Sequence, residues 1–239
     1  MAKKTKSKKN SIDKRVFFII AGVIIVAMAF TFFMMRPEVS SLDENSPTLV
    51  EVNGQHVTEG DLQLSRKLLE TQTGQQVSDE VALEHAVVQE LMIQEAEDRG
   101  YSVSKKEAEE QLSDFTASKG LNLEEEKKKL ESQGQDYDEL LEGYRNQILI
   151  GYIIEEEVNP GQPTQEEIEV FYESNKQNFK TPEGETVSYT LLEPQIREAL
   201  VQQDARAQYI EFVQSLKSEA EIVYLTDSHV GESYPELSS

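Results

Sequence analysis

The pattern of apolar and polar positions divides the chain into one continuous apolar run and a longer region of short periodic segments. Residues 16–35 form the run, which holds twenty residues without a charged side chain. A helix of that length spans about 30 Å, the thickness of the hydrocarbon core of a bilayer. Because the run is apolar on all sides, it favours a membrane-spanning helix over a buried core helix, which is normally amphipathic.

Charges on either side of the run predict its orientation. Residues 1–15 hold seven Lys and Arg side chains against one Asp, a net charge of +6, and only Arg36 follows the run closely. The positive-inside rule then keeps this basic tail in the cytoplasm and residues 37–239 outside. The alternative is a cleaved signal peptide followed by secretion, because residues 27–29, Ala-Met-Ala, have the spacing of a cleavage site. A retained anchor is favoured, since the apolar run continues through residues 30–35.

The region beyond the run shows mainly helical periodicity. Residues 36–48 are rich in Ser, Pro and acidic side chains and are predicted to be a linker. Apolar residues then recur at helical spacing, and N-cap residues or glycines mark the ends of the helices. Helices are predicted at residues 58–73, 78–99, 104–119, 123–131 and 138–158, from Thr164 onward, and at 194–218. The apolar face of the second helix is predicted to include Val81, Val88 and Met92.

Short extended segments are predicted between these helices. Leu49–Val52 and residues 220–225 read as strands, with a turn at Asn53-Gly54 after the first. Thr186–Leu192 is also extended in character, and Pro194 fits the first turn of the helix that follows. Residues 226–239 are polar and are predicted to be disordered. The expected fold class is mainly α, in one domain at residues 49–225.

Composition excludes several classes of function. Residues 37–239 hold 15 Lys and Arg against 44 Asp and Glu, a net charge of −29, which argues against nucleic-acid binding. The chain holds no Cys, so disulfides, a thiol nucleophile and a zinc–thiolate site are excluded. Of the three histidines, His85 falls on an apolar helix face and is predicted to be structural and hydrogen-bonded. His56 and His229 have no partner at catalytic spacing, so no catalytic residue, metal or cofactor is predicted.

Seven large apolar side chains are candidates for binding unfolded polypeptide. They recur along residues 138–158 and around the helix that begins at Thr164, and they are Leu141, Tyr144, Ile148, Tyr152, Phe171, Tyr172 and Phe179. The alternative is that they fill the core, which is the usual place of large apolar residues. Exposed apolar patches mark binding surfaces, so part of the set is expected to line a groove. The sequence alone leaves open which residues line it and which are core.

An ordered set of short motifs over residues 49–182 resembles the SurA N-terminal domain family of extracytoplasmic chaperones. The motifs are Val52-Asn53-Gly54 with Val57-Thr58, Val87-Val88 through Gly100-Tyr101 to Ser104, Tyr137, Tyr144-Arg145 and Ile148, Pro163-Thr164 to Ile168, and Phe171-Tyr172 with Phe179. The resemblance rests on their order, since no single motif is specific. With the apolar anchor, the layout is most similar to the membrane-anchored, PpiD-like and SurA-like foldases. The resemblance implies a helical chaperone core with a small sheet shared by residues 49–52 and 222–225.

One departure from the family bears on catalysis. In many relatives a parvulin domain, which is a prolyl isomerase, would follow the position of Pro182. Here only eleven residues separate Pro182 from Pro194, too few for such a domain. The resemblance therefore implies a chaperone core without its isomerase domain, and no enzymatic activity is predicted.

These observations predict a membrane-anchored, extracytoplasmic, ATP-independent chaperone, or holdase. Its expected partners are unfolded or newly translocated polypeptides and the membrane, with the Sec translocon as a candidate. Two alternatives remain open: a foldase of the isomerase family with residual activity, and a non-catalytic tether or translocon accessory protein. Protection of unrelated clients from aggregation separates a holdase from a tether.

Overall fold

The computed structural model describes residues 46–225, except residues 133, 135 and 183. Within this part of the chain there are seven helices and one small three-stranded sheet. The fold is therefore mainly helical, as the sequence predicts. No helix of the described residues is both long and apolar enough to cross a bilayer.

Several predicted segments fall outside the described residues. They are the basic tail at residues 1–15, the predicted membrane span at 16–35, all but the last residues of the linker at 36–48, and the tail at 226–239. Their predicted structures remain predictions.

The chain divides into two compact units. The first runs to Ile153 and resumes at Glu219, and the second is Ile154–Ser218. The first unit contains β1 (Thr48–Val52), β2 (Gln55–Thr58), α2 (Glu59–Thr73), α3 (Asp79–Asp98), α4 (Lys105–Ser118), α5 (Leu123–Ser132), most of α6 (Tyr137–Glu157) and β3 (Ile222–Tyr224). The second unit contains α7 (Gln165–Asn175) and most of α8 (Tyr189–Glu219).

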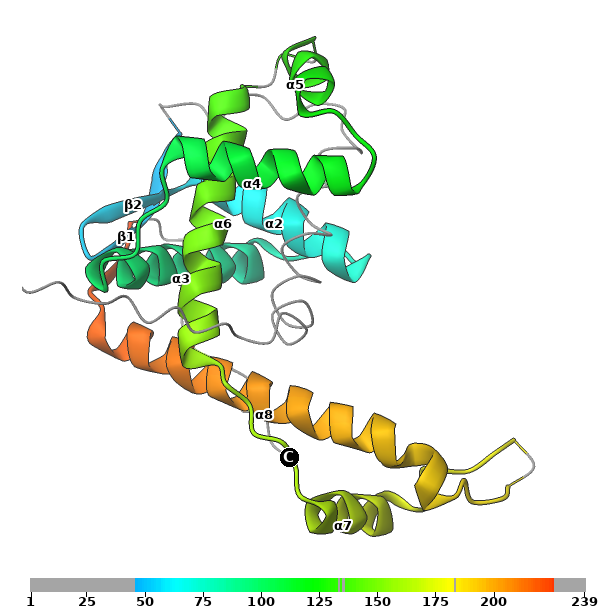
Figure 1. Cartoon of the computed structure of the whole chain (residues 1–239). Coiled ribbons are helices and arrows are strands. Elements are labelled where there is room, and N and C mark those ends of the chain that lie inside the picture. The colour runs from blue at the N-terminus through cyan, green and yellow to red at the C-terminus, as the bar shows by residue number, and fades with distance from the viewer. Residues whose placement is uncertain (1–45, 133, 135, 183, 226–239) are drawn as a thin grey trace, which may run out of the picture. The chain divides into compact units, whose positions relative to one another are not determined.

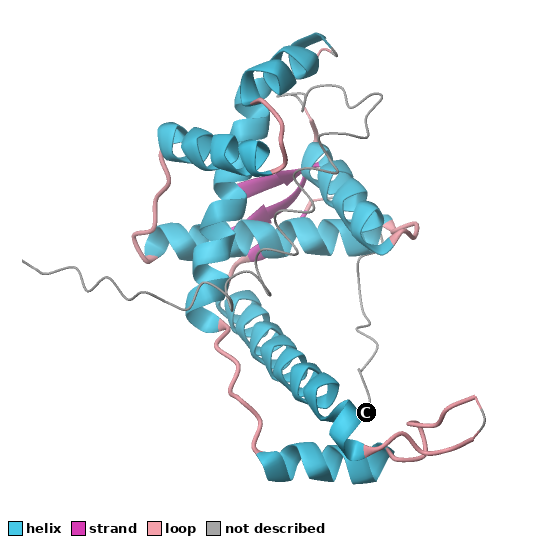
Figure 2. Ribbon diagram, turned by 45° about the vertical axis from the view of Figure 1, so that its right-hand side comes forward, coloured by secondary structure: helices cyan, strands magenta, loops and turns pink. Residues whose placement is uncertain are grey.

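The sheet joins the two ends of the described chain. Its order is β2-β1-β3, and β1 pairs antiparallel with both neighbours. Figure 2 shows the strands in magenta among the helices. Asn53 and Gly54 form the β1–β2 turn with φ angles of 50° and 81°, the left-handed region that this tight hairpin requires. On the other side, Val52 lies opposite Ile222. The small sheet that the family resemblance implies is thus confirmed.

Helix α3 contributes eight buried residues to the first unit. It packs against α2 and against strands β1 and β2 (Figure 1). Met92 is 2% exposed, and Val50 and Val52 of β1 are fully buried, so the contact between α3 and the sheet excludes solvent. The prediction that Val81 belongs to the buried face of α3 is wrong. Val81 is 54% exposed, because at this end the buried face passes through Ala82, Leu83 and Ala86 instead.

The predicted helix caps are confirmed. Capping boxes close the start of three helices, with the pairs Thr58 and Asp61, Ser104 and Glu107, and Thr164 and Glu167. Gly74 ends α2 in the left-handed conformation, with φ of 65°. These local hydrogen bonds satisfy the N–H and C=O groups that helix ends leave free.

Helix α8 begins earlier than predicted. Tyr189–Leu192 is helical rather than extended, and Pro194 lies inside the helix rather than in its first turn. One apolar cluster with Ile168 and Tyr172 of α7 takes side chains from α8 at helical spacing, namely Tyr189, Leu192, Ile196 and Leu200. Packing of this face outweighs both the β-propensity of the segment and the single hydrogen bond that Pro194 cannot donate.

Candidate polypeptide-binding surface

The seven candidate residues fall into two groups in different units. Leu141, Tyr144, Ile148 and Tyr152 follow one face of α6 in the first unit. Phe171, Tyr172 and Phe179 lie on α7 and just after it, in the second unit. Each group is described separately below.

The α6 group is partly core. Leu141 is 2% exposed and Ile148 is 8% exposed, so neither side chain offers much surface. Tyr144 and Tyr152 are half-buried, and burial raises the pKa of the Tyr144 hydroxyl. The ring of Tyr152 lies against that of Tyr101, with centroids 5.5 Å apart. Only the two tyrosines of this group therefore reach the surface.

Arg145 holds α6 in place. Its Nε donates a 2.7 Å hydrogen bond to the backbone oxygen of Val103, in the connection between α3 and α4. Its Nη1 donates to both carboxylate oxygens of Glu142, each at 2.6 Å. The guanidinium group of Arg145 thus has hydrogen-bond partners on two sides, one of them outside α6.

The second group forms an aromatic cluster with one residue that the sequence did not single out. The cluster consists of Phe171, Tyr172, Phe179 and Tyr189. Tyr172 stacks on Phe179 with centroids 5.8 Å apart and meets the edge of Tyr189 at 5.5 Å. The Tyr172 hydroxyl donates to the backbone oxygen of Val187 at 2.7 Å. Tyr172 is buried, whereas the other three rings are partly exposed.

Polar contacts link α7 to the start of α8. The side-chain amide of Gln165 donates to the hydroxyl of Tyr189. Arg197 donates to the backbone oxygen of Pro163 at 3.1 Å and pairs with Glu193 at 3.1 Å. These contacts fix the aromatic cluster between the two helices.

Two exposed apolar residues in the second unit escaped the sequence reasoning. Val170 is 59% exposed and Leu191 is 68% exposed. Val170 is two positions from both Ile168 and Tyr172, about 200° around the helix from each, so it points away from the buried face. The sequence gives the position of Val170 around the helix, but it does not show which face of α7 is buried.

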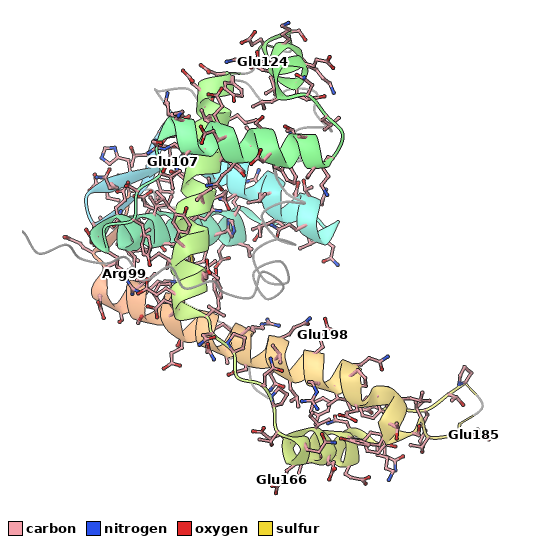
Figure 3. All side chains as sticks on the ribbon, in the orientation of Figure 1. Arg99, Glu107, Glu124, Glu166, Glu185 and Glu198 are labelled. Carbon is pink, nitrogen blue, oxygen red and sulfur yellow. The ribbon has the colours of Figure 1, made fainter. Side chains whose placement is uncertain are left out.

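The loop that follows α7 is short and is closed by backbone pairing. After α7, Val187 N donates to the oxygen of Phe179 at 2.8 Å, and Lys180 pairs with Thr186 in an isolated bridge. The residues between α7 and α8 thus form a short, hairpin-like loop. Figure 3 shows Glu185 on this loop.

The histidines form no catalytic arrangement in the described residues. Burial lowers the pKa of His85, and its Nδ1 has no hydrogen-bond partner among them, so the predicted hydrogen bond to His85 is not seen at that atom. His56 is exposed beside Thr48 and Glu51. His229 lies outside the described residues. Within these residues no group of His, Asp or Glu side chains could hold a metal ion.

Comparison with known families identifies the chain. The family described as the SurA-like N-terminal domain matches residues 9–128. The chain belongs to the SurA-like N-terminal domain family. The match ends before α6 begins, so all seven candidate binding residues lie outside the part that it covers. No curated protein matches the chain in sequence.

A solved structure shows the same fold. It comes from work on the virulence factor PEB4 and a related periplasmic protein, two SurA-like chaperones of Campylobacter jejuni. The similarity has a TM-score of 0.55 at 13% sequence identity, and covers 74% of this chain and 98% of that one. At this identity the likeness concerns the fold alone. Family and fold together support a chaperone-type function for this chain.

Proposed function

We propose that this SurA-like protein is an ATP-independent holdase, anchored in the cell membrane by residues 16–35, with its helical domain outside. It binds unfolded or newly translocated polypeptides and keeps them from aggregating. The anchor and its orientation rest on the apolar run and the basic tail before it. The Sec translocon, from which such clients emerge, is a candidate neighbour.

The observation that carries the proposal is that most of the apolar side chains gathered between α7 and α8 are only partly buried. Only Ile168, Tyr172 and Ile196 are buried in this cluster. A larger group is only partly buried around them: Phe171, Phe179, Tyr189, Leu192 and Leu200. Val170 and Leu191 are exposed outright. A helix pair that leaves this much apolar surface to solvent is suited to transient contact with unfolded chain.

We further propose that the protein is not an enzyme. A short loop follows Phe179, at the position where the family resemblance leads us to expect a parvulin domain. Isomerisation of an X–Pro bond has a barrier near 20 kcal/mol and needs a dedicated, shaped site. The nine residues between Phe179 and Tyr189 make a turn and one isolated bridge, which supports a purely binding role.

An aggregation assay tests the holdase proposal. The full chain, in nanodiscs of a zwitterionic lipid, is added without ATP to a chemically denatured model client as the client is diluted. Light scattering should fall at near-stoichiometric ratios for at least two unrelated clients, whereas empty nanodiscs should have no effect. Protection of no client, or of a single folded partner only, would favour a tether.

Protease accessibility tests the proposed topology. In spheroplasts, external protease should degrade residues 37–239 while an epitope placed before residue 16 stays intact. The expected result follows from the net charge of +6 on the tail. Degradation of the epitope together with protection of the domain would reverse the assignment, and release of the intact domain into the medium would indicate signal cleavage.

A further inference from the structure

We infer that the strand at the C-terminal end of the described chain docks on the surface of the bilayer that holds the anchor. The docking patch consists of Val223 and Tyr224 of β3 and of Leu225, which follows them. The inference rests on the membrane anchor of the proposed function. It adds a second contact with lipid, made by the first unit itself.

The docking patch is apolar and exposed. Val223, Tyr224 and Leu225 are 41%, 38% and 49% exposed. Single apolar side chains are common on protein surfaces, whereas contiguous ones mark contact surfaces. Among the described residues, no other exposed large apolar side chains are consecutive in the chain. The patch therefore calls for a partner that the described residues do not supply.

The patch wraps around one edge of the sheet. β3 pairs with β1 and is the last strand in the order β2-β1-β3. Tyr224 lies opposite Val50, which is fully buried, and Val223 lies opposite Glu51. Because successive residues of a strand point to opposite faces, Val223 and Leu225 share the face that Val50 does not use. The edge thus presents apolar side chains on both faces of the sheet.

Strand pairing places the patch beside the point where the chain arrives from the anchor. The backbone N–H of Leu225 donates to the oxygen of Leu49 at 2.9 Å, and Leu49 is the second residue of β1. The predicted span ends at residue 35, so residues 36–47 form the linker between span and strand. Fully extended, a linker of this length reaches about 40 Å. The end of the sheet that carries Leu225 is therefore the end attached to the linker.

The linker selects the bilayer as the occupant of the patch. Three side chains bury too little area to hold a free domain on lipid. The linker raises the effective concentration of the lipid surface to about the millimolar range, so a weak contact suffices. Tyr is enriched at membrane–water interfaces, and aliphatic side chains bury area there. A second copy of the chain is a poor occupant, since each copy carries a formal net charge of −22.

Charges beside the patch favour a zwitterionic lipid surface over an anionic one. The side chain of Glu51, opposite Val223, is 41% exposed, and the exposed Glu221 directly precedes β3. Glu51 lies 3.6 Å from His56, which balances its charge only when that histidine is protonated. Anionic headgroups repel carboxylates over about one Debye length, about 10 Å in 0.1 M salt. Docking should therefore weaken as anionic lipid is added.

Tryptophan fluorescence of the full chain in nanodiscs tests the inference. The chain has no Trp, so Leu225→Trp introduces a single probe into the patch. In zwitterionic lipid brominated near the headgroup, its emission should fall by about half relative to the same lipid without bromine. Replacing about a third of the lipid by an anionic lipid should reduce this quenching at low salt. Addition of about 0.5 M NaCl should restore the quenching, because salt screens exposed charges.

The matched control is Val81→Trp, also at an exposed position of the first unit. Val81 is 54% exposed and lies thirteen positions along α3 from Gln94, whose side chain donates to the Val52 oxygen of β1. That spacing is about 20 Å along the helix. The emission of Val81→Trp should be the same in brominated and unbrominated lipid.

Two further changes vary the docking itself. Adding Val223→Ser to Leu225→Trp should lower the quenching, since Val223 shares the face of Leu225. A Gly-Ser insertion that doubles the length of the linker should lower the ratio of docked to undocked protein roughly threefold. The insertion leaves every described residue unchanged, and circular dichroism should show each substituted protein folded.

The outcomes separate this inference from the anchor and from the holdase. Quenching of Leu225→Trp no stronger than that of Val81→Trp overturns docking and leaves both proposals standing. A blue shift of Leu225→Trp without quenching means that protein covers the patch, whether a segment of this chain, a second copy or a client, and overturns docking as well. Loss of the full chain from the nanodiscs on gel filtration removes the anchor, and this inference with it.

Discussion

Asn53 and Glu221 exchange two hydrogen bonds across 168 positions of the chain. The backbone N–H of Asn53 donates to the oxygen of Glu221, and the N–H of Glu221 donates to Oδ1 of Asn53, both at 2.8 Å. The Asn53 amide also donates to Oε1 of Gln94 on α3 at 2.8 Å, and Gln94 in turn donates to the oxygen of Val52 at 3.0 Å. One side chain thus ties together the hairpin turn, α3 and the chain entering β3.

We expect Asn53→Ala to destabilise the first unit by about 2–4 kcal/mol. The substitution removes two side-chain hydrogen bonds, and Ala adopts a φ of 50° less readily than Asn does. Asn53→Gly keeps the conformation but loses the amide, so it should cost about 1–2 kcal/mol. Urea unfolding followed by circular dichroism measures both. Equal costs for the two substitutions would show that backbone strain contributes nothing here.

Burial of His85 predicts a loss of stability on mild acidification. Because its pKa is lowered in the folded state from 6.5, the unfolded chain takes up the proton first. The contribution is therefore complete above the unfolded pKa and is lost as the pH falls below it. His85→Gln should reduce the fall of the unfolding free energy as the pH drops below 6.5. His56→Gln, at an exposed histidine, is the control, and an unchanged slope for His85→Gln would refute the prediction.

Core and surface substitutions should separate the candidate binding residues. Leu141→Ala or Ile148→Ala is expected to cost about 2–5 kcal/mol, because both side chains are buried on α6. Leu191→Ala, at a position 68% exposed, should change stability by no more than about 0.5 kcal/mol. Thermal unfolding measures the three together. A Leu141→Ala protein as stable as the parent would mean that Leu141 faces solvent and remains open as a binding residue.

The full chain should not accelerate prolyl isomerisation. The residues after Phe179 form only a short excursion, closed by hydrogen bonds from Thr181 N to Glu185 O and from Val187 N to Phe179 O, each 2.8 Å long. A protease-coupled assay on a proline peptide, with an authentic parvulin as positive control, measures the rate. Acceleration that scales with protein concentration and survives repurification would contradict the prediction.

Local signals in the sequence determined most helix boundaries. Ser104 with Glu107 and Thr164 with Glu167 are capping pairs whose hydrogen bonds span only three residues, so no distant contact is needed to predict them. Gly74 ends α2 for an equally local reason. Glycine adopts the left-handed conformation of a helix C-cap without steric cost, so this end depends on one residue. The pairing of β1 with β3 is different, because it joins residues far apart in the chain, such as Val52 and Ile222, and was implied only by the family resemblance.

Tertiary packing decided what local signals could not. Tyr189–Leu192 has the composition of a strand, yet it is helical because Tyr189 and Leu192 complete the apolar cluster with α7. On α6, Leu141 and Tyr144 lie three positions apart on one face, yet the first is core and the second half-exposed. The sequence by itself determined where the capped helices begin, because a capping hydrogen bond depends on residues within one turn. Which part of each apolar face stays open to a client depends on what packs against it from elsewhere in the chain, and only the tertiary structure decided that.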